Sequence, residues 1–347
     1  MSVNESLAQA SNTLVYSSMA VYTGALLAFT VDLSGRGRPG GSSLSQEQAE
    51  PQRERVAAGA ASASSGSAPR GGISRIAAAE APGAPGVASP LPAGHSRAAG
   101  IAVSLTWLAF LLHLGGVVAR AASAQRVPWG NMYEFSVSGS LVVTGVFLAL
   151  LTRRDLRYLG TFVTGPVLLT LGLAVTVLYT RSAQLMPALR SYWLVIHVSV
   201  AFIASALLTL GFCTTVLQEV QARREAARAQ GRPPARGAFM DRLPGSEELE
   251  RSGYRMHMVA FPLWTFSVIA GAIWAEAAWG RYWGWDPKEV WSFVIWMVYA
   301  AYLHARLTRG WDGSRAAAIV YVGYGCLLFN FLVVNIFFVG KHSYSGL

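Results

Sequence analysis

Apolar residues along the chain gather in long runs that are separated by shorter polar segments. A helix needs about 20 mostly apolar residues to cross the hydrocarbon core of a bilayer. Eight windows meet this requirement. They predict an all-α polytopic membrane protein with about eight transmembrane helices, over residues 12–32, 99–119, 135–152, 159–179, 193–217, 257–276, 288–306 and 316–338.

The basic residues between these windows predict the orientation of the chain. Twenty-one of the 28 Lys and Arg residues lie in the segments 34–97, 153–158, 218–256 and 305–315, which alternate with segments that hold the other seven. Cytoplasmic segments of membrane proteins accumulate Lys and Arg. We therefore expect both termini, and the segment around residue 280, on the outer face of the cytoplasmic (plasma) membrane.

The chain divides into three parts. Residues 1–33 hold the first predicted helix, and no basic region precedes it, which argues against a cleaved signal peptide. Residues 34–97 consist mostly of Gly, Ser, Ala, Pro and Arg and predict a disordered cytoplasmic linker. Residues 98–347 hold the other seven helices. Within them, segment 218–256 predicts a helical continuation to Gln230, a break at Pro233-Pro234 and a solvated connector.

Composition supports this class and excludes others. Hydrophobic residues make up 53% of the chain and charged residues only 13%, whereas soluble domains carry about 25% charged residues. The net charge of +10 follows from the membrane topology, so we predict no nucleic-acid partner. Cys213 and Cys326 both lie inside apolar windows, where they are expected to be small core residues.

Tryptophan is concentrated in one stretch, residues 274–291, which holds five of the eleven Trp residues. An aromatic belt at a membrane interface explains one or two Trp per helix end, but not five. The stretch predicts a platform for a flat apolar ligand, with interfacial anchoring as the simpler alternative. Asp286 and Glu289 surround Pro287 and are expected to cap the next helix.

Histidines supply the candidate chemistry. Ionisable groups inside a membrane are costly and are functional candidates by default. From the rise of a helix, His197 lies about 6–9 Å below the outer face, close to His342, whereas His304 lies about 24 Å deep. For His113 we expect a buried hydrogen bond. His257 either accompanies His304 or reaches the inner surface with its polar tip.

Two neutral imidazoles that approach from opposite sides hold a haem iron, and aromatic walls suit the faces of the porphyrin. A zinc site needs about four ligands, and the pair His197 and His342 has no obvious third or fourth. The pattern therefore favours an outer haem site with these two axial ligands, walled by tryptophans. His304 belongs either to a deeper site or to a structural hydrogen bond.

The motifs resemble those of a known family. The run from Trp279 to Glu289 resembles the signature of the WWD haem-handling superfamily. Within it, the chain resembles the CcsA/ResC-type subunits (also labelled CcsB) of system II cytochrome c synthases. Further matches are Pro128-x-x-Asn131-x-Tyr133-Glu134, the segment Pro187 to His197, Tyr302-Leu-His304 and His342-Ser-Tyr344.

The resemblance implies a haem-translocating and haem-presenting subunit. It implies haem b as the transported cargo, an apocytochrome c as acceptor, and a ResB-like partner that supplies the second ligand beside His304. It implies His197, His342 and His304 as ligands of the iron. Together with the tryptophan platform, the candidate haem-site residues are His197, His342, His304, Trp279, Trp283, Trp285, Asp286 and Trp291. Arg190, Arg281 and Lys288 are candidates for pairing with the haem propionates or are interfacial charges.

Two other functions compete with this hypothesis. A haem carrier or exporter, which hands haem to a separate chaperone or lyase, belongs to the same superfamily, but its members differ in the number of spans. A transporter of non-haem solutes predicts internal repeats with interrupted helices, and the sequence shows no such repeat.

Overall fold

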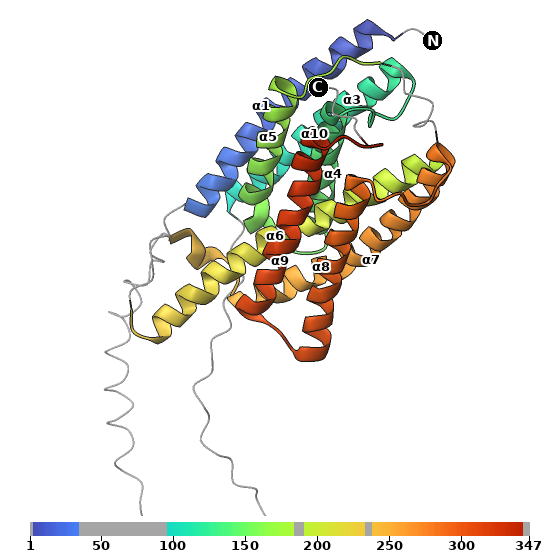
Figure 1. Cartoon of the computed structure of the whole chain (residues 1–347). Helices are drawn as coiled ribbons and strands as arrows, with labels where there is room; N and C mark the ends of the chain where they lie inside the picture. Colours follow the sequence, from blue (N-terminus) through green and yellow to red (C-terminus); the bar gives the residue numbers. More distant parts are fainter. Residues whose placement is uncertain (1–2, 35–95, 184–190, 233–237, 343–347) are drawn as a thin grey trace, which may run out of the picture. The chain divides into compact units, whose positions relative to one another are not determined.

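The computed structural model describes residues 3–34, 96–183, 191–232 and 238–342. Arg190, the Pro233-Pro234 break, Tyr344 and nearly all of the predicted 34–97 linker lie outside these residues. The described residues form a bundle of long helices (Figure 1). The α-helices are α1 (Glu5–Ser34), α3 (Arg97–Ala124), α4 (Met132–Leu151), α5 (Gly160–Thr176), α6 (Tyr192–Ala229), α7 (Ser246–Trp279), α8 (Pro287–Arg309), α9 (Gly313–Leu328) and α10 (Val334–Phe337).

Within the described residues, eight helical segments are long and apolar enough to cross a membrane, as the apolar windows predict. Short 3₁₀ turns, Arg157–Leu159 and Ala238–Arg242, precede α5 and α7. A π-helical turn, Phe329–Val333, joins α9 to α10, so these three form one span. The protein is therefore an all-α polytopic membrane protein.

Polar caps mark the points where the chain enters several spans. The side chains of Ser96, Asn131 and Ser191 accept hydrogen bonds from backbone N–H groups in the first turns of α3, α4 and α6. Asp286 and Glu289 form a capping box at the start of α8, which confirms the expected capping role. Such caps pair N–H groups that the helix itself leaves free.

Two antiparallel helix pairs form much of the bundle: α1 with α3, and α6 with α7. Gly116 of α3 lies so close to α1 that an added Cβ would lie 2.9 Å from Val15. Ser11 donates to the Gly116 carbonyl oxygen at 2.7 Å. Small residues and interhelical hydrogen bonds of this kind hold helices together where lipid removes the hydrophobic driving force.

The predicted solvated connector over 218–256 is wrong over much of its length. The helical continuation to Gln230 is confirmed, because α6 ends with Gln230 as its C-cap. However, Gln218, Glu219 and Arg224 are buried, and α7 already begins at Ser246. These polar residues pack against neighbouring segments: Arg224 pairs with Asp241 at 2.8 Å, and Ser314 donates to Glu219 at 3.0 Å. The charge run therefore serves helix packing as well as solvation.

Candidate functional site: a histidine and tryptophan cavity

A cavity of about 330 Å³ lies among α4, α5, α6, α7, α8 and α9. It lies within the usual size range of ligand pockets. Its lining on α6 extends from Leu194 to Thr209, which spans about 22 Å of helix. At the end nearer the 280–286 loop, the lining includes Trp129, His197, Trp274, Trp283, Lys288 and His342. The cavity thus brings together the two histidines that the sequence placed near the outer face.

His197 is held by three neighbours on α7. Its Nδ1 lies 2.7 Å from the backbone oxygen of Ser267, so this nitrogen carries the proton and donates. The imidazole is parallel to the Trp274 ring, with centroids 6.3 Å apart. It also rests on Gly271, where an added Cβ would lie 2.7 Å from the imidazole Cε1. With Nδ1 engaged, Nε2 is the nitrogen available to a metal ion in the cavity.

His342 is held by Asp286. Its Nδ1 lies 3.0 Å from Oδ1 of this buried carboxylate. The imidazole packs edge-on against Trp279 and Trp274, with centroids 4.8 and 5.6 Å apart. A carboxylate that orients a histidine through one ring nitrogen is the usual support for a metal ligand on the other.

Asp286 also anchors the chain around this histidine. It accepts hydrogen bonds from the backbone N–H groups of Lys341 at 2.6 Å and Lys288 at 3.2 Å. Partial burial by itself raises the pKa of the Asp286 carboxyl. The hydrogen bonds and charge of His342, with those backbone N–H groups, outweigh this effect and hold the pKa below its usual value.

The predicted tryptophans take different positions. Trp283 lines the cavity, and Trp279 contacts His342. Trp291 packs against Phe329, with ring centroids 4.2 Å apart, and is not part of the cavity lining. Trp285 is 71% exposed and adopts a left-handed backbone conformation with φ of 59°. A non-glycine residue in this region is strained, and such strain concentrates at functional loops.

His304 lies on another part of the molecule. It is exposed on α8, about 26 Å along the helix from Pro287, and it is not part of the cavity lining. His257 is fully buried against Tyr299, Tyr302 and Gly211, which contradicts the alternative that its polar tip reaches the inner surface. His113 is also fully buried, 3.4 Å from the Tyr22 hydroxyl, as expected.

Sequence reasoning missed several residues of the cavity. Trp274 lies beside both His197 and His342, and Trp129 packs edge-on against Phe202 of α6. Trp274 begins the tryptophan-rich stretch, so its position was a usable signal. Of the predicted cations, Lys288 lines the cavity. The Arg281 guanidinium instead lies over Gly284.

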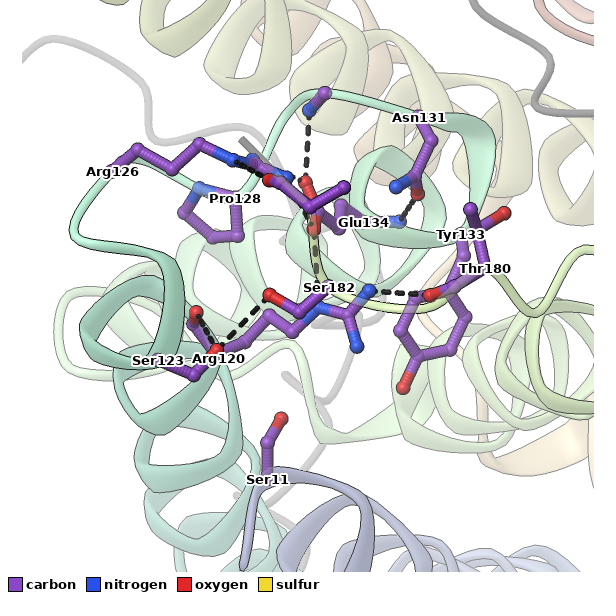
Figure 2. Close-up of polar contacts among 12 residues, drawn as sticks. Ser11, Arg120, Ser123, Arg126, Pro128, Asn131, Tyr133, Glu134, Thr180 and Ser182 are labelled. Carbon is purple, nitrogen blue, oxygen red and sulfur yellow. Dashed lines mark hydrogen bonds and ion pairs between the residues drawn. The ribbon is translucent and has the colours of Figure 1, made fainter. Parts of the chain in front are cut away.

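A buried ion cluster fixes the loop that carries Trp129 (Figure 2). The carboxylate of Glu134 is 1% exposed and pairs with Arg120 at 3.0 Å and with Arg126 at 2.6 Å. It also accepts from the backbone N–H of Gly130 at 2.9 Å. The loop between α3 and α4 is therefore fixed by contacts to Arg120, Arg126 and Gly130, which keeps Trp129 and Asn131 in the cavity wall.

Comparison with known proteins now identifies the family. The model of the family described as "cytochrome C assembly protein" matches residues 129–342. The chain belongs to this family, and within it to the CcsA type. The match begins at Trp129 and ends at His342, so it spans the histidines and tryptophans of the cavity.

Two relatives define the type. The cytochrome c biogenesis protein CcsA of Prochlorococcus marinus is 36% identical over 252 residues, covering 66% of this chain and 79% of the relative. The CcsA of Synechococcus elongatus is 34% identical over 288 residues, covering 71% and 86%. The resemblance inferred from the motifs is confirmed, and the family places the chain in cytochrome c maturation.

A solved structure shares the fold. The cytochrome c haem lyase CcmF aligns with a TM-score of 0.57 over 96% of this chain, at 17% sequence identity. The chain spans about half of that protein, 47% of its length. At this identity the likeness establishes the arrangement of helices in the family.

Proposed function

We propose that the cavity holds haem b as a transported cargo, with His197 and His342 as its two axial ligands. One observation carries the proposal: both histidines line the same cavity, and each has Nδ1 engaged by an oxygen atom. This leaves an Nε2 on each ring for the iron. The apolar, aromatic lining suits the faces of a porphyrin, and the lone pair of neutral imidazole is the form that binds iron.

The proposed role is to present haem to an apocytochrome c. In the attachment reaction, each thiol of a Cys-x-x-Cys-His motif adds across a haem vinyl group. Sulfur bonds to one vinyl carbon, hydrogen adds to the other, and nothing leaves. The chain has no Cys-x-x-Cys-His motif of its own, so it serves as the presenting party. Fixing the vinyl edge relative to the incoming thiol raises the effective concentration of the two reactants.

A second, deeper haem position is proposed at His304. The side chain is exposed on α8, within a helix that spans the membrane, and it lies on the same face as Phe293, Met297 and Ala301. An imidazole exposed to lipid is costly, whereas a partner helix that packs on this face removes the cost. We infer that a ResB-like partner covers this face and supplies the second ligand.

The proposed orientation places the 280–286 loop on the outer side of the plasma membrane. The segments at the opposite ends of the helices hold 21 of the 28 basic residues. His304 then lies near the inner face and the histidine pair near the outer face. Haem therefore moves outward, from the deeper position at His304 to the pair His197 and His342.

Cytochrome c maturation in cells that lack this chain tests the proposal. Wild type and His113→Ala should restore covalently attached haem, whereas the double variant His197→Ala, His342→Ala should not. His113 is a matched control because it is buried in the bundle but outside the cavity lining. Equal maturation by the double variant would contradict the assignment.

The relay from the deeper position makes a separate prediction. His304→Ala, produced together with the partner, should lower the haem content of the outer site while His197 and His342 are intact. Haem content is measured per purified complex from the reduced absorption spectrum. Unchanged haem content in this variant would refute the relay but leave the outer site intact.

A further inference from the structure

Lys288 places a positive charge in the wall of the cavity, in the first turn of α8. Its Nζ donates to the backbone oxygen of Asn330 at 2.8 Å and to Oδ1 of Asn335 at 3.0 Å. Both acceptors are neutral. Among the residues that the structure describes, no carboxylate lies within ion-pair distance of this ammonium group.

The ammonium group has one donor left. A lysine carries three N–H groups, and the two asparagines take two of them. A cation that is withdrawn from water without a counter-charge is costly, particularly inside a membrane bundle. One N–H of Lys288 is therefore available to an acceptor that enters the cavity, and a carboxylate is the acceptor that would also supply the missing counter-charge.

The acidic neighbours of Lys288 are turned to other partners. Asp286 accepts from His342 and from backbone N–H groups. Oε2 of Glu289 accepts from the backbone N–H groups of Gly284 and Asp286, at 2.8 and 3.0 Å. Neither acid neutralises the ammonium by direct contact, so the charge of Lys288 remains available to a ligand.

The same cavity wall carries further polar atoms without a partner. Oγ of Ser136, Oδ1 of Asn330 and Oε1 of Glu289 are buried, lack a hydrogen bond within the described part of the chain, and belong to residues of the lining. Asn330 also lies in the π-helical turn, and such turns are frequent at functional sites. Of these atoms, the Ser136 hydroxyl can donate a hydrogen bond to a carboxylate, whereas Oδ1 of Asn330 and Oε1 of Glu289 can only accept from a donor group.

We propose that Lys288 forms a carboxylate-binding subsite of the cavity, which takes a propionate of the haem cargo. This inference rests on the proposed haem function and adds the group that sets the rotation of the macrocycle about its axial ligands. An ammonium–carboxylate hydrogen bond fixes one edge of the porphyrin at α8. The opposite edge, which carries the vinyl groups, then faces away from Lys288.

Asn335 acts as the positioning residue of this subsite. Its Oδ1 accepts from Lys288, while its Nδ2 donates to the backbone oxygen of Phe331 at 2.8 Å. The amide orientation is thereby fixed, and with it the direction of the lysine side chain. Replacing Asn335 with Leu should weaken the preference for a carboxylate, while Lys288 itself remains.

The test compares haem b with its dimethyl ester, in which both propionates are masked and the iron and macrocycle are unchanged. The purified full chain is titrated with each ligand, and binding is followed by absorption. Wild type should bind haem b about 10- to 100-fold more tightly than the ester, and Lys288→Met should lose this preference. Lys288→Arg should keep most of it. Arg251→Met is the matched control, since Arg251 is an exposed cation of α7 that is not part of the cavity lining.

The outcomes separate the subsite from the haem site. Wild type that binds both ligands equally, or Lys288→Met that keeps the full preference, overturns the subsite but not the haem function. If Lys288→Met lowers the affinity for haem b and for the ester by the same factor, the lysine is purely structural, and the proposed subsite is overturned. Wild type that binds neither ligand refutes the haem function itself.

Discussion

At the scale of single residues, Asp286 links three parts of the site. Its side chain caps α8, accepts the backbone N–H of Lys341 and orients His342. Gly340 must pass close to it, because an added Cβ would lie 2.4 Å from Oδ2 of Asp286. One buried carboxylate thus fixes the tail that carries a proposed iron ligand relative to the helix that carries Lys288.

Replacing Asp286 with Asn should lower haem affinity at the outer site by about 10- to 100-fold, the usual effect of removing a residue that orients a metal ligand. An amide keeps the size of the side chain but loses the charge and one acceptor. The measurement is a haem titration of the purified chain. Glu276→Gln is the control, since Glu276 is an exposed acid in the last turn of α7. Equal affinity in both variants would contradict the orienting role.

The same carboxylate predicts a pH dependence. The pKa of Asp286 lies below its ordinary value, so the folded state favours the ionised form. This contribution to stability is fully present above the unfolded pKa of about 3.9 and is lost as pH falls through the lower, folded value. Between pH 5 and 8, Asp286 should therefore stay ionised and keep its hydrogen bonds to Lys341 and His342. The measurement is the tryptophan fluorescence of the ligand-free chain, which should show no change from titration of Asp286 over this range.

The sequence predicted only part of this arrangement. Asp286 and Glu289 were expected to cap a helix because capping depends on neighbouring residues. The bond from Asp286 to His342 joins residues 56 positions apart and depends on how α9 and α10 return to α8. Likewise, the exposure of Trp285 follows from its backbone conformation, which the spacing of tryptophans does not encode.

At the scale of elements, the α6–α7 pair is locked by two reciprocal contacts. The His197 ring of α6 rests on Gly271 of α7, and the His257 ring of α7 rests on Gly211 of α6. The contacts lie 14 residues apart along each helix, which is about 21 Å. Each ring needs a glycine opposite it, so the register of the helix pair and the position of His197, the proposed iron ligand, depend on one another.

Gly271→Ala should therefore displace His197 and weaken haem binding, even though alanine favours helix formation. Its Cβ would lie 2.7 Å from the imidazole Cε1, and overpacking of this kind costs about 1–3 kcal/mol. Haem titration and thermal unfolding of the purified variant give the two readouts. Gly325→Ala in α9 is the matched control, because its Cβ would meet no atom within 4 Å. Full haem affinity in Gly271→Ala would refute the coupling.

The loop before α4 makes a second prediction at this scale. Removing one partner of a buried ion pair leaves the other charge uncompensated, so Glu134→Ala should lower the free energy of unfolding by about 3–5 kcal/mol. Glu247→Ala removes an exposed ion pair with Arg251 and should change the free energy of unfolding by less than about 1 kcal/mol. Denaturant titration in detergent compares the two variants. Similar losses of unfolding free energy in the two variants would show that the ion cluster around Glu134 does not stabilise the loop.

The ends of helices were predictable from hydropathy only where they coincide with the edge of the hydrocarbon core. Apolar windows found all eight spans, because hydrocarbon thickness fixes the length of an apolar run. The polar end of α6 was predicted from its charged continuation to Gln230, but the start of α7 at Ser246 was missed because its first turns are polar and lie outside the apolar window. Buried Glu219 and Arg224 show that tertiary pairing, rather than hydropathy, extends α6 and α7 there.

At the scale of the whole molecule, the bundle separates two candidate haem positions. The histidine pair and Lys288 share the cavity, whereas His304 lies on the exposed face of α8 beyond the lining. The cavity reaches Thr209 and Tyr324 and so extends from His197 and His342 toward the other end of the helices. This arrangement is compatible with the proposed path along the bundle, in which a partner subunit covers His304 at its start.

The coordination of ferric haem in the purified full chain tests the central claim most directly. Electron paramagnetic resonance should show a low-spin, six-coordinate iron in wild type. His197→Ala and His342→Ala should each lose this signal, and added imidazole should restore it. A low-spin signal that persists unchanged when both histidines are replaced would contradict the account.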